Sequence, residues 1–259
     1  LHQKMDYLYP FREYAPSRQR AAGPSGPFTL DRVRTDAGIL SALIFRGVTF
    51  GTDFFFQYPI FFNDIAHFHQ VKDQATANYL EANGENPPKS YFCDSAAYGP
   101  SNHRRVVELA DEYANVLRND SWEAKLQGRE KLPFQECFEW LYGCTPTKAV
   151  LGPLASYLLT ADLVYSGSVE SPTVDDMAFI IWTLNKGGAR GLELLHLISP
   201  GKKLKKGWAR PKKKECVAAV RGLYKRILQW MPKGMHNSVG FNLIVLEHCL
   251  CKFSRAVKK

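Results

Sequence analysis

The side chains best suited to bind an anion lie in a lysine-rich tract between residues 202 and 214, with the sequence KKLKKGWARPKKK. Lysine and arginine neutralise phosphate groups, and Trp208 within the tract could stack on an unpaired base. A helix is expected to follow, on which Arg221 and Lys225 would continue the positive strip from Lys214. The candidate nucleic-acid-binding residues are Lys202, Lys203, Lys205, Lys206, Trp208, Arg210, Lys212, Lys213, Lys214, Arg221 and Lys225.

The segregation of charge along the chain supports this interpretation. Residues 201–259 contain 16 lysines and arginines against two acids, a net charge of +14. Residues 1–200 contain 18 basic and 23 acidic residues, a net charge of −5. A section this basic on a mildly acidic body predicts a polyanionic partner, and both DNA and RNA are compatible with it.

Other interpretations of the tract stay open. Pro211 followed by three lysines is also typical of a nuclear-import signal, in which case the helices would bind another protein or a second copy of the chain. The tract could contact an anionic membrane surface, although no amphipathic apolar face accompanies it. It could also be a solvated linker.

Metal and catalytic motifs are not apparent. His67 and His69 would share a face on a strand, but we expect a helix there, on which they point about 200° apart. The six cysteines match no zinc-binding spacing, so we expect no metal. The sequence contains no nucleophile elbow, phosphate-binding glycine loop or metalloprotease helix, so no cofactor is expected and no catalytic residue is assigned. Whether the protein is an enzyme is left undecided.

Two further features need a structural explanation. Asp162 lies in an otherwise apolar helical segment, where a buried carboxylate needs a cationic partner or could act as an acid or base. The glycine-rich stretch 187–191 is interpreted as the end of a helix rather than a phosphate loop.

Helical periodicity along the chain predicts an all-α fold, a multi-helix globular bundle. We expect the first long helix to begin at Thr29, as its N-cap, and to run to about residue 48. Eight aromatic residues between positions 50 and 68 are expected to form a central core helix, with a ligand pocket as the alternative.

Three sections are expected along the chain. Residues 1–28 contain four prolines and are predicted to form an irregular, extended arm. Residues 29–200 would form the helical body, and residues 201–259 a basic linker and two helices that pack on that body. The last helix, about 238–255, is apolar nearly all round and should therefore be buried, either in the body or in a partner.

Composition also bears on location. No stretch approaches the ~20 apolar residues of a membrane-spanning helix, and the N-terminus has no signal-peptide core. Cysteines in apolar contexts are typical of a reducing compartment, so we expect a nuclear or cytoplasmic protein that is neither secreted nor membrane-spanning and has no membrane partner. The chain begins at Leu1, so it could be a fragment of a longer protein. The expected function is non-enzymatic nucleic-acid binding. The alternative is a helical protein–protein interaction module with a nuclear-import signal.

Overall fold

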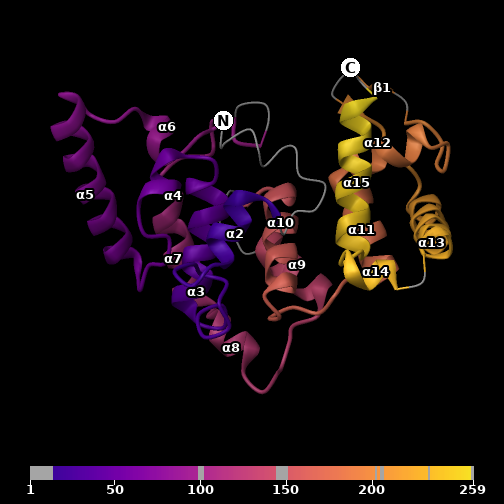
Figure 1. Ribbon diagram of the computed structural model, residues 1–259, viewed down its shortest axis with the longest axis horizontal. Helices are drawn as coiled ribbons and strands as arrows, with labels where there is room; N and C mark the ends of the chain where they lie inside the picture. Colours follow the sequence, from indigo (N-terminus) through magenta and orange to yellow (C-terminus); the bar gives the residue numbers. More distant parts are fainter. Residues whose placement is uncertain are drawn as a thin grey trace. The chain divides into compact units, whose positions relative to one another are not determined.

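The computed structural model describes residues 14–98, 102–143, 151–201, 203–204, 207–232 and 234–257. Within these ranges the regular structure is helical apart from one pair of two-residue strands and an isolated bridge between Leu132 and Val169, which confirms the all-α prediction (Figure 1). The chain divides into two units whose boundary falls between Glu170 and Ser171. We call the described residues 14–170 unit 1 and the described residues 171–257 unit 2.

The helices of unit 1 are mostly short. They are α2 (Pro16–Ala22), α3 (Asp36–Ile44), the π-helix η2 (Phe45–Thr49), α4 (Asp53–Gln57), α5 (Ile65–Asn83), α6 (Lys89–Phe92), α7 (Leu109–Asn119), α8 (Trp122–Leu126), α9 (Phe134–Gly143) and α10 (Pro153–Tyr165). α3 packs against α7, and α9 packs against α10. α2 lies in the segment that was expected to be an irregular arm, so residues 16–22 do not follow that expectation. The helix begins with Pro16, whose fixed φ suits the first turn of a helix.

The helix that was expected to begin at Thr29 begins instead at Asp36. Thr35 is its N-cap, and the Thr35 hydroxyl accepts a hydrogen bond from the backbone nitrogen of Gly38 at 3.0 Å. The residues before it form turns that bring the backbone of Arg32 against Gly38, where any Cβ would overlap the Arg32 carbonyl group. The prediction was wrong about the start because residues 29–35 form turns, in which the backbone nitrogens of Val33 and Thr35 donate to the carbonyl oxygens of Thr29 and Arg32, and helical periodicity does not distinguish such turns from a helix.

The aromatic segment forms core, as expected, but it is not one helix. α4 has five residues and ends before Pro59. The rings of Phe54, Phe55, Phe62 and Phe68 are nearly or fully buried, and Phe54 meets Phe68 edge to face at 6.3 Å between ring centroids. Edge-to-face packing of this kind stabilises a core beyond the burial of apolar area.

Unit 2 is built around its last helix. Its elements are α11 (Val174–Leu184), α12 (Gly187–Leu194), β1 (Lys203–Leu204), β2 (Gly207–Trp208), α13 (Lys213–Trp230), α14 (Met235–Ser238) and α15 (Leu243–Ala256). α15 packs closely on α12 and also contacts α11, which in turn packs on α13. The side chains of Ile244, Val245 and Leu246 are 0–1% exposed, which confirms that the first turns of the last helix are buried. The helix begins at Leu243 rather than near residue 238, and Phe253 is 38% exposed, so the burial does not extend all round it. The contacts between these helices join α11 and α12 to the later ones, so all of them belong to unit 2.

The glycines at 187–191 do not end a helix. α11 ends at Leu184, its C-cap Asn185 adopts the left-handed conformation (φ 46°), and α12 begins at Gly187. A Cβ on Gly191 would lie 2.6 Å from the carbonyl oxygen of Leu250, and one on Gly187 would overlap the sulfur of Cys251. The glycines therefore let α12 approach α15 closely.

Candidate nucleic-acid interface

The basic tract begins as a short hairpin. β1 and β2 pair antiparallel, with Lys203 opposite Trp208 and Leu204 opposite Gly207. Three of the predicted site residues, Lys202, Lys205 and Lys206, lie outside the described residues, as do the side chains of Lys203 and Trp208. The part of the candidate site whose side chains are described therefore starts at Arg210.

Aromatic side chains of α11 hold the next part of the tract. The indole nitrogen of Trp182 donates a hydrogen bond to the carbonyl oxygen of Pro211 at 3.0 Å, and the guanidinium of Arg210 lies over the Trp182 ring, 4.9 Å from its centroid. The ammonium of Lys213 lies 5.1 Å from the centroid of the Phe179 ring. A cation–π contact orients a cation without neutralising it, so both side chains keep their charge for an anion. Sequence reasoning missed this pair of rings, although their i, i+3 spacing places them on one face of a helix.

Cations also gather at the start of α13. Lys212 is the N-cap, and Lys213 and Lys214 are the first two helical residues; all three are exposed. Glu215 is the acid of this first turn, and its carboxylate lies 3.9 Å from the Lys212 ammonium. Because the N-terminus of a helix carries a partial positive charge, lysines there are electrostatically unfavourable, and a bound polyanion would relieve the repulsion.

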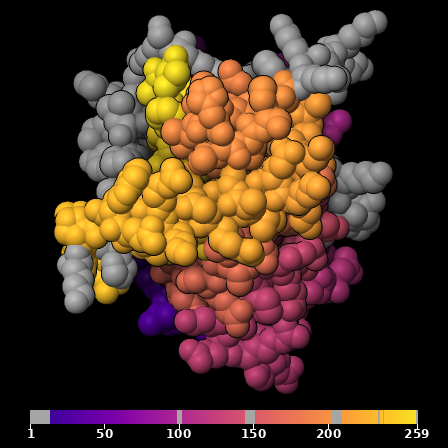
Figure 2. Space-filling model, turned by 90° about the vertical axis from the view of Figure 1, so that its right-hand side faces the viewer, coloured from indigo at the N-terminus to yellow at the C-terminus, as the bar shows by residue number. Residues whose placement is uncertain are grey.

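The outward face of α13 carries the rest of the site. Cys216, Ala219 and Val220 are buried, whereas Arg221 and Lys225 are exposed, and Figure 2 shows α13 as an orange-yellow band open to solvent. The Arg221 guanidinium lies 3.3 Å from the carboxylate of Asp175. Both side chains are well exposed, so the pair is worth at most about 1 kcal/mol and would not prevent Arg221 from binding a phosphate.

Arg226 and Trp230 of α13 were not among the predicted site residues. Arg226 is exposed, and Trp230, the last residue of the helix, is 76% exposed. No prediction was made for either residue from the sequence.

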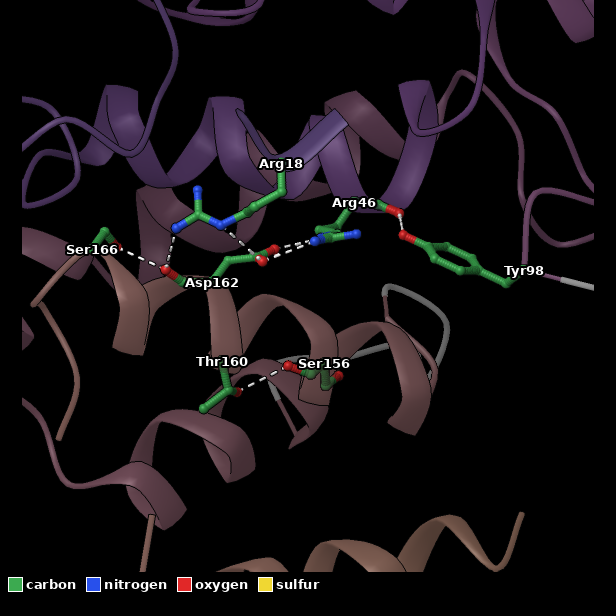
Figure 3. A network of polar contacts seen from close by, with 7 residues as sticks. All are labelled: Arg18, Arg46, Tyr98, Ser156, Thr160, Asp162 and Ser166. Carbon is green, nitrogen blue, oxygen red and sulfur yellow. Dashed lines mark hydrogen bonds and ion pairs between the residues drawn. The ribbon is translucent and has the colours of Figure 1, made fainter. Parts of the chain in front are cut away.

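Asp162, the residue that the sequence left open, belongs to a buried ionic network in unit 1 (Figure 3). Its carboxylate receives two hydrogen bonds from the guanidinium of Arg46, at 2.5 and 2.8 Å, and lies 3.4 Å from the Nε of Arg18. The side chain of Asp162 is fully buried, and those of both arginines are 5% exposed. The expectation of a cationic partner is confirmed.

The surroundings hold this network in its ionised form. Burial alone would lower the pKa of Arg46, but its charge attraction and hydrogen bonds to Asp162 and Tyr98 together outweigh that effect, so the pKa is raised above its ordinary value. Tyr98 donates a hydrogen bond to the carbonyl oxygen of Arg46 at 2.9 Å. Arg105 donates to the carbonyl oxygens of Gly47 and Val48, both at 3.0 Å, and so pairs backbone groups of the π-helix. The contacts of Asp162 are those of a structural ion pair.

The histidine pair also has a structural explanation. Asp64 caps α5 by accepting a hydrogen bond from the backbone nitrogen of His67 at 2.8 Å, and His69 Nε2 lies 2.9 Å from a carboxylate oxygen of Asp111. Both histidines are on a helix, as expected. Within the described ranges, no three His, Cys, Asp or Glu side chains come together as metal ligands would.

Comparison with known proteins adds no constraint. No protein-family model matches the chain, and neither the curated proteins nor the solved structures contain a significant match. In the part of the chain that the structure describes, no helix combines the length and the apolar character needed to cross a bilayer.

Proposed function

We propose that unit 2 binds nucleic acid through the segment 209–230. The observation that carries this proposal is the density of exposed cations. The segment contains seven lysines and arginines and a single acid, Glu215, and the seven basic residues are all exposed. They are Arg210, Lys212, Lys213, Lys214, Arg221, Lys225 and Arg226.

Phosphate contacts would supply the affinity. Each lysine or arginine that pairs with a phosphate releases condensed counterions, which favours binding at low salt. α13 is a rigid support for these cations, and the contacts of Arg210 and Lys213 with aromatic rings hold two of them in place before binding. Contacts of this kind position a protein on the backbone and carry no base sequence by themselves.

The test is removal of charge from the tract. The seven lysines to be replaced by glutamine in one variant are Lys202, Lys203, Lys205, Lys206, Lys212, Lys213 and Lys214. Its affinity for an oligonucleotide should fall at least about 10-fold at low salt, and the slope of log affinity against log salt should flatten by roughly 0.7–0.9 for each phosphate that the variant no longer neutralises. A mobility-shift titration at several salt concentrations measures both quantities.

A matched control removes lysines from unit 1. Lys72, Lys89 and Lys125 replaced together by glutamine should leave affinity nearly unchanged, whereas Lys212, Lys213 and Lys214 replaced together should not. Equal affinity and equal salt slope in the tract variant and the wild-type protein would refute the proposal. Tight binding to a protein partner that is insensitive to salt would instead favour the interaction-module alternative.

A further inference from the structure

Trp230 is the most conspicuous apolar side chain on the surface of unit 2. It is 76% exposed, whereas tryptophan is on average a well-buried residue. An indole has a large apolar area, and leaving it in water forgoes the stabilisation that burial would provide. An exposed, planar ring of this kind is therefore a good candidate for contact with a ligand.

The surroundings of Trp230 are cationic. The guanidinium of Arg226 lies over the Trp230 ring at 5.9 Å from its centroid, one helical turn away. Arg221, Lys225 and Arg226 are exposed along the same helix, and α13 contains no acid after Glu215. Three exposed cations with no acid after Glu215 are complementary in charge to a polyanion, and an exposed aromatic plane can stack on an unpaired base.

We propose that Trp230 stacks on a base of single-stranded nucleic acid while Arg226 and Lys225 contact the flanking phosphates. This inference rests on the proposed function of unit 2 and assigns a substrate class to it. A single strand presents unpaired bases with an accessible face, and stacking on an aromatic ring contributes to its binding. In a duplex the base faces are covered by their neighbours, so the same ring gains little there.

Two substitutions separate stacking from general apolar contact. Trp230→Phe keeps an aromatic plane, and Trp230→Leu keeps an apolar side chain without one. Because Trp230 is largely exposed, neither change should lower the melting temperature by more than about 2 °C. Affinities are measured for a single-stranded DNA oligonucleotide and for its duplex, by fluorescence anisotropy at one fixed salt concentration.

The expected result is a selective loss. Trp230→Leu should weaken single-strand binding by about 5- to 100-fold and duplex binding by less than about 2-fold, and Trp230→Phe should stay within about 3-fold of the wild-type protein for both. Trp182→Phe is not a suitable control, because Trp182 fixes Pro211. Lys72→Gln, in unit 1, serves as the unrelated substitution.

Other outcomes would overturn the inference in distinguishable ways. Wild-type single-strand affinity in Trp230→Leu, with duplex binding intact, would refute stacking and leave the proposed function standing. An equal loss for single strand and duplex would show that Trp230 acts without stacking. Preferential binding of the wild-type protein to phosphatidylserine vesicles, or a dimer that Trp230→Leu dissociates, would assign the ring to a membrane or to a second copy. If the wild-type protein binds neither oligonucleotide, the proposed function fails as well.

Discussion

Replacement of Asp162 by asparagine should destabilise unit 1 strongly. The side chain is fully buried and neutralises Arg46, and it also lies within ion-pair distance of Arg18. The substitution preserves shape but removes the negative charge, so two buried guanidiniums would be left without their shared counterion. An arginine cannot escape this cost by losing a proton, because its pKa stays far above any pH of the assay.

The magnitude follows from the geometry. At about 3 Å and an effective dielectric constant of about 20, two unit charges attract each other by roughly 5 kcal/mol. Breaking a buried ion pair by removing one partner costs about 3–5 kcal/mol in proteins. Since a domain of this kind is stable by only about 5–15 kcal/mol, Asp162→Asn should remove a large fraction of the free energy of unfolding.

Hydrogen-exchange mass spectrometry is the assay of choice, because it reports on α3 and α10 of unit 1 separately from the helices of unit 2. The free energy of exchange for protected amides of α3 and α10 should fall by about 3–5 kcal/mol in Asp162→Asn. Ser156→Ala, also on α10, is the matched control. Its hydroxyl oxygen is buried without a hydrogen-bond partner among the described residues, so its removal should cost little.

A double-mutant cycle completes the test. If the carboxylate of Asp162 and the guanidinium of Arg46 are coupled, Arg46→Met combined with Asp162→Asn should cost at least about 1 kcal/mol less than the sum of the single substitutions. Protection that falls by less than about 1 kcal/mol in Asp162→Asn, or strictly additive costs in the cycle, would refute the structural role assigned to this pair.

Three further predictions concern unit 2. Gly191→Ala should lower the stability of unit 2 by about 1–3 kcal/mol, because the new methyl group meets the Leu250 carbonyl. Gly222→Ala should raise it by up to about 1 kcal/mol, because the methyl group has open space and alanine favours a helix more than glycine does. Denaturant unfolding measures both changes. Truncation after Gly234 removes α15 and its buried face and should cost several kcal/mol, so a monomeric product with an unchanged melting temperature would contradict it. Burial raises the pKa of the Cys216 thiol to about 11, so at pH 8 it should react with a thiol reagent far more slowly in the native than in the unfolded protein. The unfolded thiol ionises near about pH 8.5, whereas the native thiol ionises only near pH 11. The free energy of unfolding should therefore fall as the pH rises from about 8.5 toward 11, which melting temperatures across that range would show.

The sequence by itself determined the features that depend only on residues close together along the chain. Helical periodicity is local, so the all-α class and the helical setting of His67 and His69 were predictable. The apolar run at the start of the last helix is local, so its burial was predictable without knowledge of its partners, although Phe253 is exposed. The basic tract is a matter of composition, and its lysines at 212–214 are exposed because charged side chains are costly to bury without partners.

Only the tertiary structure decided which distant residues meet. Asp162 needs a cation, but its partner Arg46 is 116 positions away, and no local pattern distinguishes that arginine from the others. The glycines of α12 were interpreted as the end of a helix, because glycine is common there. Their role in close packing is visible only in their contact with α15. The same holds for the exposure of Trp230. Helical periodicity states which residues share a face of α13, but only the packing of α11 on that helix decides which face is covered.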